Sequence, residues 1–190
     1  KKKNMAKDNF SLIVEGKEEA QIVYEDDLFL AFITEEALAP GQVTIIPKEK
    51  YTIFEMVPNS VLAKLAIVIK VVSSGVFESL QCHGTNLLIE NGVSAGQEVP
   101  YFSLQVVPRF ENDGIDLDWE GEELEEFDME NVMMQLKAQL DGSAAPIMDK
   151  ELSEVGDAAI EEDSLDDYDD LEEEDPSKNN YLLKSLRKIP

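Results

Sequence analysis

Short β-branched and other apolar runs between turn residues predict β-strands along the first part of the chain. The two earliest flank the turn pair Asp26 and Asp27 and predict a hairpin. A third is ended by Pro47, and the last two surround a glycine-containing loop. The five expected strands cover residues 21–25, 28–33, 42–46, 86–89 and 101–107. Over residues 101–107 apolar and polar residues alternate, which predicts a polar row on one face of that strand.

Apolar residues recur every three or four positions between residues 60 and 80, which predicts a long helix. Asn59 or Ser60 is suited to cap its start. Its many Val and Ile residues lower helix propensity, so we expect the helix to be packed in the core, with Gly75 allowing a close approach.

A second helix is expected over residues 122–140, where apolar residues keep helical spacing in an acidic segment. This spacing is typical of a helix packed at the surface, and Gly142 is suited to end it. The composition then changes to Asp, Glu and Ser, so we expect an acidic disordered linker over residues 142–179. The domain itself is expected to span residues 8–141.

The last segment, residues 180–190, differs from this linker because it combines apolar and basic side chains. Its spacing suits one face of a short helix, which predicts a terminal amphipathic motif that binds a partner. A terminal turn that folds back on the acidic linker or on the domain is the alternative. The expected partner-binding residues are Tyr181, Leu182, Leu183, Leu186, Arg187 and Ile189.

Acidic residues are concentrated outside the expected domain core. The 190-residue chain has a formal net charge of −25. Residues 1–110 contain 14 acidic and 10 basic side chains, whereas residues 111–180 contain 27 and 3. This balance argues against nucleic acid or an anionic membrane as a partner and favours a basic protein.

Cys82 and His83 are the only cysteine and the only histidine. They could suggest a thiol nucleophile or a pair of metal ligands, but two ligands make a poor metal site. We expect a loop or core pair, with no metal and no cofactor. Neither a signal peptide nor an apolar run near the roughly 18 residues of a membrane span is apparent, so a soluble, cytoplasmic protein is expected.

Two motifs make the chain resemble the histidine-triad (HIT) family. The first is Ala39-Pro40-Gly41-Gln42-Val43-Thr44-Ile45-Ile46-Pro47-Lys48. The second is Gly96-Gln97-Glu98-Val99-Pro100-Tyr101-Phe102-Ser103-Leu104-Gln105-Val106-Val107-Pro108-Arg109. The resemblance covers about residues 8–140. It implies an α+β fold with a five-stranded antiparallel sheet, a long core helix and a second C-terminal helix, usually assembled as a homodimer.

The resemblance also implies where the catalytic residues should be. In the family, three histidines surround the α-phosphate of a nucleotide, and the middle one attacks phosphorus. Tyr101, Ser103 and Gln105 stand at those positions here. An unassisted serine hydroxyl needs a general base, which Gln105 is not, so the triad is degenerate.

Other positions that the resemblance assigns to the nucleotide site also differ from the residues that bind nucleotide in the family. Thr34 replaces an aspartate that binds ribose, Gln42 replaces a histidine, and Glu90 replaces an asparagine and would repel phosphate. Gly96 and Gln97 match the phosphate-contacting turn, with Glu98 beside them. These six positions are the candidate nucleotide-binding residues, and weak nucleotide binding stays open.

We therefore expect a catalytically inactive HIT-like protein that acts as a binding or regulatory module through its acidic tail and terminal motif. A HIT-related hydrolase or transferase with a different nucleophile, and a non-catalytic nucleotide sensor, are the alternatives.

Overall fold

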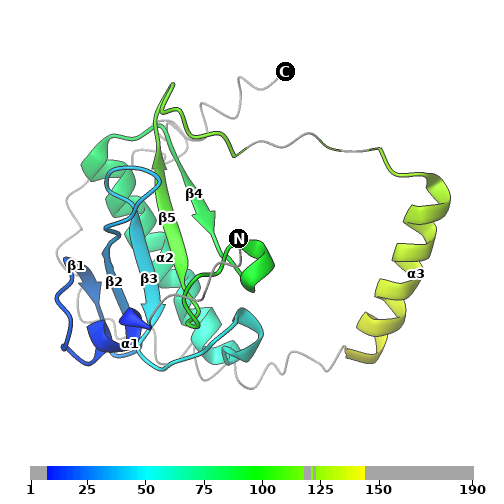
Figure 1. Ribbon diagram of the computed structural model, residues 1–190, viewed down its shortest axis with the longest axis horizontal. Coiled ribbons are helices and arrows are strands. Elements are labelled where there is room, and N and C mark those ends of the chain that lie inside the picture. The colour runs from blue at the N-terminus through cyan, green and yellow to red at the C-terminus, as the bar shows by residue number, and fades with distance from the viewer. Residues whose placement is uncertain (1–7, 118–120, 122, 144–190) are drawn as a thin grey trace, which may run out of the picture. The chain divides into compact units, whose positions relative to one another are not determined.

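A five-stranded antiparallel sheet is the centre of the fold (Figure 1). The computed structural model describes residues 8–117, 121 and 123–143. The strand order is β1-β2-β3-β5-β4, and every neighbouring pair is antiparallel. The strands are β1 (Ile22–Glu25), β2 (Phe29–Ile33), β3 (Val43–Pro47), β4 (Gly84–Leu88) and β5 (Leu104–Arg109).

The β1–β2 hairpin forms because Asp26 satisfies the backbone of its own turn. One oxygen of this carboxylate accepts hydrogen bonds from the backbone N–H groups of Leu28, at 2.7 Å, and Phe29, at 2.6 Å. The predicted hairpin around Asp26 and Asp27 is confirmed.

Strand β5 begins later and ends later than the sequence predicted. Ladder pairing starts with Leu104 opposite Ile45, and the strand continues to Arg109. The residues before it are held differently, since the N–H of Phe102 donates to the carbonyl of Tyr51 at 2.6 Å. Tyr101 and Ser103 therefore precede the strand in which they were expected.

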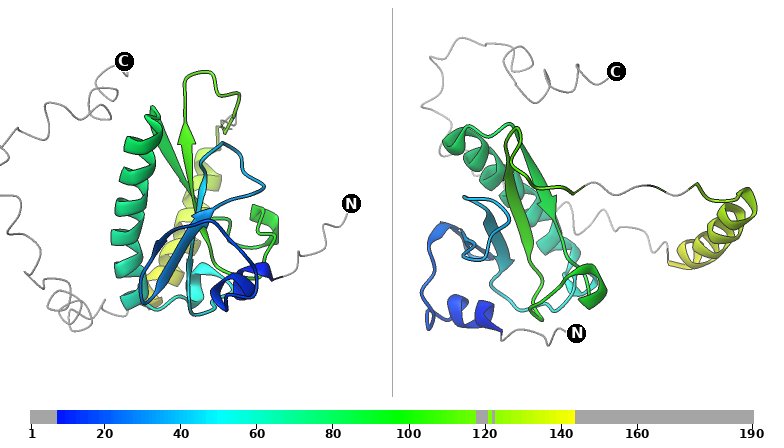
Figure 2. Two further views of the ribbon diagram at one scale, coloured as in Figure 1. Left: turned by 90° about the vertical axis from the view of Figure 1, so that its left-hand side faces the viewer. Right: turned by 45° about the horizontal axis from the view of Figure 1, so that its top comes forward.

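The long helix α2 (Asn59–Leu80) covers one face of the sheet (Figure 2). Its buried side chains, Leu65, Val68, Val72 and Val76, belong to one hydrophobic cluster with residues of β2, β3 and β5. The predicted core helix is confirmed. Neither Asn59 nor Ser60 caps it, because the chain enters in extended conformation at Pro58, whose carbonyl accepts from the first turn.

Gly75 does not serve the close approach that was expected. A Cβ atom added at this glycine would have no heavy atom within 4 Å among the residues described. Gly75 instead lines an apolar cavity between α2 and the sheet.

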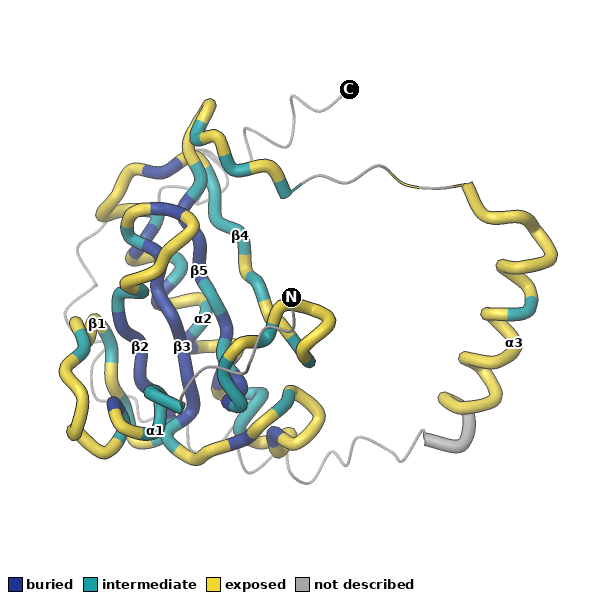
Figure 3. Tube along the Cα trace, viewed as in Figure 1, coloured by how far each residue is buried: buried dark blue, intermediate teal, exposed yellow. Residues whose placement is uncertain are grey.

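The other face of the sheet is covered in part by α1 (Asn9–Val14), a helix that the periodicity did not predict. The Asp8 carboxylate accepts from the backbone N–H of Ser11 at 3.1 Å and caps it. Ile13 packs with Leu30, Phe32, Ile46 and Tyr101 in a second hydrophobic cluster. The buried strands between the two clusters are dark blue in Figure 3.

Helix α3 (Glu126–Ser143) belongs to a separate structural unit, residues 116–161. It begins four residues later than predicted, and Gly142 lies inside it rather than after it. Its side chains from 126 to 140 are exposed except for the half-buried Asn131. The described residues of its own unit do not cover these side chains.

Helix α2 is long and apolar enough to cross a membrane by length and composition alone, contrary to the sequence-based expectation. The mostly buried core helix of a folded domain passes the same test; α2 buries the side that faces the sheet, and 17% of its apolar window is buried. The expected linker over residues 142–179 and the motif at 180–190 lie outside the described residues, apart from the helical positions 142 and 143.

Candidate functional site

Polar side chains gather on the face of the sheet opposite α2, where the alternation of β5 predicted them. Gln105 is at the centre, and its Oε1 accepts from Thr44 Oγ1 at 2.7 Å and from Gln42 Nε2 at 3.1 Å. Thr34 Oγ1 lies 2.6 Å from Thr44 Oγ1. Because the single hydroxyl proton of Thr44 goes to Gln105, Thr34 is the donor in this pair.

We call these side chains the Gln105 network. Their polar atoms bond to one another or to the backbone of the protein, and the members are Thr34, Gln42, Thr44, Ser103 and Gln105. Gln42 Oε1 accepts from the backbone N–H of Leu38 at 2.8 Å, and Gln105 Nε2 donates to Ser103 Oγ at 3.4 Å. Gln42 and Thr44 are buried. Buried polar groups of this kind are stable because they are paired.

The Gln105 network contains no group that can accept a proton at neutral pH. Its members are hydroxyls and carboxamides, neither of which is a base in water. The Ser103 hydroxyl faces the NH₂ group of Gln105, a donor that cannot take its proton. Ser103 therefore has no activating partner in this network.

Tyr101, the first position of the degenerate triad, is buried away from this network. Its hydroxyl donates to the carbonyl of Pro47 at 2.6 Å, and its ring packs edge-on against Phe10 of α1 at 5.9 Å between centroids. Burial, followed by the negative charge of Asp8 and by Tyr51, raises the pKa of Tyr101 to about 12. The hydroxyl is thus protonated at neutral pH and serves the packing of the second cluster.

Lys50 brings a positive charge close to this position, which the sequence had not indicated. Its Nζ lies 5.9 Å from the centroid of the Tyr101 ring and is paired with the Asp8 carboxylate. In the sequence, this charge is visible only as the short basic run after β3. The sequence does not show that Lys50 forms an ion pair with Asp8, which is 42 residues away.

The loop between β4 and β5 contains the short 3₁₀ helix Val93–Ala95 and a glycine that its backbone requires. Gly96 has a φ of +102°. A Cβ atom added there would lie 2.6 Å from Oε1 of Glu90. A carboxylate therefore lies against the turn that the resemblance assigns to phosphate contact, with the exposed Glu98 nearby in the chain.

Gln97 uses its side-chain amide to hold this loop in place. Oε1 accepts from the backbone N–H of Gly92 at 2.8 Å, and Nε2 donates to the carbonyls of Thr52 at 2.7 Å and Val99 at 3.0 Å. Both ends of the amide are engaged within the protein. The structure thus gives Gln97 a structural role beside the one that the motif suggested.

Arg109 closes the second motif and fixes the chain after β5. Its guanidinium pairs with both oxygens of Asp113, at 2.7 and 3.1 Å, and donates to Asn86 Oδ1 at 2.6 Å. This contact holds the pKa of Asp113 well below its ordinary value. The network is structural and lies at the end of the sheet where β4 begins.

Cys82 and His83 behave as the expected core and loop pair. Cys82 is buried in the cluster beneath α2, whereas His83 is exposed and its Nδ1 accepts from the backbone N–H of Glu111 at 3.1 Å. Across the part of the chain that the structure describes, no group of three or more His, Cys, Asp or Glu side chains is arranged to hold a metal ion.

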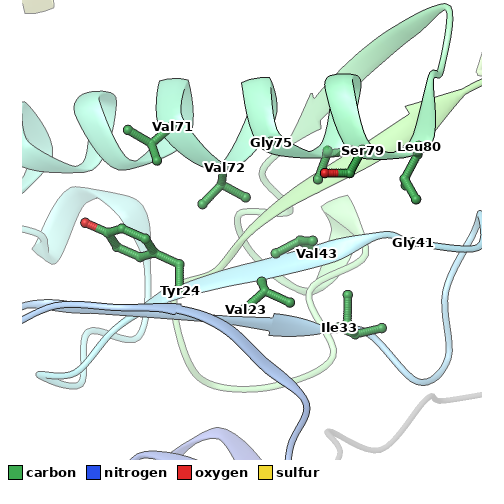
Figure 4. Close-up of a pocket in the computed structure, with 11 residues that line it drawn as sticks. Val23, Tyr24, Ile33, Gly41, Val43, Val71, Val72, Gly75, Ser79 and Leu80 are labelled. Carbon is green, nitrogen blue, oxygen red and sulfur yellow. The ribbon is translucent and has the colours of Figure 1, made fainter. Parts of the chain in front are cut away.

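An apolar cavity of about 340 Å³ lies on the α2 side of the sheet (Figure 4). Val71, Val72 and Gly75 of α2 face Tyr24 and Val43 across it. It is separated from the Gln105 network by the sheet, since Val43 belongs to the cluster under α2. Sequence reasoning did not indicate this cavity.

Comparison with known proteins identifies related sequences and folds. The sequence model of the HIT domain matches residues 15–112. Adenylylsulfatase HINT3 of Arabidopsis thaliana is 31% identical over 60% of this chain and 57% of its own, so the chain spans little more than half of that relative. A HIT-like protein of Methanocaldococcus jannaschii is 30% identical over 67% of this chain and 97% of its own.

Two further relatives extend the comparison. The asymmetrical bis(5'-nucleosyl)-tetraphosphatase of Schizosaccharomyces pombe is 28% identical over 56% of this chain and 58% of its own. The crystal structure of a HIT family protein from Bacillus anthracis superimposes with a TM-score of 0.64 at 26% identity, covering 72% of this chain and 99% of that one.

Proposed function

Because the chain belongs to the HIT domain family, we propose that it is a catalytically inactive member that works as a binding or regulatory module. Some of its relatives are nucleotide hydrolases by name, so the fold alone would suggest hydrolysis. Fold does not fix chemistry, however, and the side chains at the site decide it. The observation that carries the proposal is the neutral Gln105 network at the positions of the triad.

Attack on phosphorus requires a nucleophile with an available lone pair and a group that manages the proton. Ser103 meets an amide donor, and Gln105 is committed to Thr44 and Gln42. Tyr101 is protonated and bonded to the carbonyl of Pro47. None of the three positions can start a nucleotidyl transfer.

Nucleotide binding is also weakened at the loop that the family uses for phosphate. The Glu90 carboxylate lies against Gly96, where an anionic ligand would meet a like charge. The side-chain amide of Gln97 is already hydrogen-bonded to the backbone of Gly92 and Thr52. We therefore expect weak nucleotide binding at most, with neither a metal nor a cofactor needed.

We expect the core to be a cytoplasmic homodimer that presents an acidic region to a basic protein partner. The exposed apolar side chains Ile67 and Val71 of α2 and the adjoining cavity support a partner copy on this face. The charge of the chain beyond residue 110 supports a basic protein rather than nucleic acid or a membrane.

The test is to heat the full chain with adenosine and guanosine nucleotides, nucleoside phosphoramidates and dinucleoside polyphosphates, following melting temperature and product in the same wells. The proposal expects no turnover and little or no stabilisation. Turnover that disappears in Ser103→Ala would overturn it in favour of a serine-dependent enzyme.

Stabilisation without turnover would instead identify a nucleotide sensor, because a ligand that binds only the native state raises stability by mass action. Glu90→Gln is the matched variant for that outcome. Removing one negative charge beside Gly96 should strengthen binding of a polyphosphate if the loop forms the site.

A further inference from the structure

Helix α3 carries a continuous apolar stripe that the described residues of its own structural unit leave uncovered. Met129, Met133, Leu136 and Leu140 follow one another at intervals of four, three and four residues, the heptad spacing of a coiled-coil seam. All four are about half exposed or more. A helix of 18 residues gains most of its stability from packing such a stripe, and the described residues of its own unit supply no such contact.

A second copy of α3 in antiparallel orientation fits this stripe closely. When Met129 of one copy lies opposite Leu140 of the other, Met133 lies opposite Leu136, and the two-fold axis repeats both layers. Every position of the stripe then faces an apolar partner. At the two ends of the seam the heptad positions Glu126 and Ser143 lie opposite each other, so the apolar seam is confined to the four central layers.

The same register pairs opposite charges along one edge of the seam. Glu130 and Lys137 both occupy the heptad position next to the stripe, and antiparallel helices bring like-named edge positions together. Glu130 of each copy therefore meets Lys137 of the other. Lys137 is the single basic residue among the described residues of α3, and the two-fold axis uses it twice.

A parallel arrangement is disfavoured by charge. It would place Glu125 of each copy, the residue directly before α3, near Glu130 of the other, giving two contacts between like charges. It would also gather both acidic first turns, with Glu126 and Asp128 of each copy, at one end. The antiparallel arrangement separates these turns and opposes the two helix dipoles.

We propose that α3 forms an antiparallel two-helix coiled coil with α3 of a second copy of this chain, held by the Met129–Leu140 and Met133–Leu136 layers and by Glu130–Lys137 pairs. This contact is additional to the proposed core dimer and uses no residue of α2 or of the Gln105 network. It makes α3 a linking element between copies.

Disulfide trapping in the full chain tests this register. Met129→Cys and Leu140→Cys are made in chains of two different masses, mixed and oxidised gently, with the buried Cys82 kept in both. The expected product is a disulfide between chains of different mass. Two Met129→Cys copies should not pair, because 11 residues of helix separate them by about 16 Å along the axis.

The matched control is the pair Asn131→Cys and Ala138→Cys. These positions have the same axial relation as 129 and 140 but lie on the opposite side of the helix. A yield for 129 with 140 that does not exceed this control would overturn the proposal, and so would a predominant 129 to 129 product, which indicates parallel helices.

Charge exchange gives a second, independent readout. Glu130→Lys alone and Lys137→Glu alone each create like-charge contacts across the seam, so each should reduce the 129 to 140 product. The double variant restores opposite charges and should restore the product. Failure of the double variant to recover it would overturn the assigned register, and neither result depends on nucleotide turnover.

Discussion

At the scale of single residues, Gln105 shows how an altered triad position can become structural. Its carboxamide oxygen accepts two hydrogen bonds, one from Thr44 of β3 and one from Gln42, the residue directly before that strand. An imidazole there could not accept from both groups while keeping a proton-accepting nitrogen free for a substrate. The amide thus satisfies buried donors and gives up acid–base chemistry.

We predict that Gln105→Ala destabilises the domain by about 1–3 kcal/mol, because it leaves the buried Thr44 hydroxyl and Gln42 amide without their acceptor. Ser103→Ala, two positions away, should change the unfolding free energy by less than about 0.5 kcal/mol. Urea unfolding of both variants checks this. Equal effects would show that water replaces Gln105 without cost.

Tyr101→Phe should remove the hydrogen bond to Pro47 and cost about 1 kcal/mol at neutral pH. The cost should shrink as pH rises from about 10 toward about 12. The pKa of Tyr101 is raised from 10.0 to about 12 in the folded protein, so its stabilising contribution is complete below pH 10 and is lost through this window.

Unfolding free energies of both proteins at pH 7 and at several values above 9 provide the measurement. Tyr24 and Tyr51 also have raised pKa values, so both proteins should weaken in alkali, and only their difference reports Tyr101. A difference that stays constant with pH would mean that Tyr101 titrates alike in the folded and unfolded states.

At the scale of elements, α2 has two apolar faces with different roles. Val68 is buried against the sheet, whereas Val71, three residues later and about 60° away round the helix, is half exposed beside the cavity. A helix that is apolar on more than one side needs more than one packing surface. The sheet supplies one, and the proposed partner copy would supply the other.

The pair Val68→Ala and Val71→Ala separates these roles with the same chemical change. Val68→Ala should lower the unfolding free energy by about 2 kcal/mol through lost burial and a small cavity. Val71→Ala should leave the fold nearly unchanged but weaken self-association, measured by sedimentation across a dilution series. Loss of stability at Val71 without a change in association would contradict the assignment of this face.

Much of the element order was predictable because turn chemistry and alternation agree. The β1–β2 hairpin follows from Asp26, and α2 from its apolar spacing. Helix α1 was missed because six residues are too few for a periodic signal. The start of β5 was misplaced because alternation continues through Tyr101 and Ser103, although the backbone between them bonds to Tyr51.

The candidate site was predictable in its members but not in its geometry. Motif spacing identified the row of Ser103 and Gln105, and the sheet brings Thr34 and Gln42 to it. Nothing local revealed that Tyr101 turns into a separate cluster under α1. Such contacts join residues far apart in the chain, so they are properties of the fold.

At the scale of the whole molecule, charge is divided between two regions. Residues 1–110 are nearly balanced, whereas residues 111–180 contain 27 acidic and 3 basic side chains. Self-repulsion of this kind opposes compaction and attracts cations and basic proteins over distances set by the ionic strength. The terminal segment 181–190, with three basic and no acidic residues, reverses the sign.

A lysine-rich polypeptide should therefore bind the full chain in a manner that salt weakens strongly, since the screening length falls from about 10 Å at 0.1 M to about 3 Å at 1 M. A chain ending at Ser143 loses 15 acidic and 5 basic side chains and should bind more weakly at low salt.

A partner that also uses the apolar residues of 180–190 should retain a salt-resistant component, because burial of apolar area is not screened. Leu183→Asp and Leu186→Asp would remove that component and leave the salt-sensitive one, as titrations at both salt concentrations would measure. Binding that is independent of salt in the full chain would contradict an electrostatic role for the acidic region and assign recognition to the terminal motif alone.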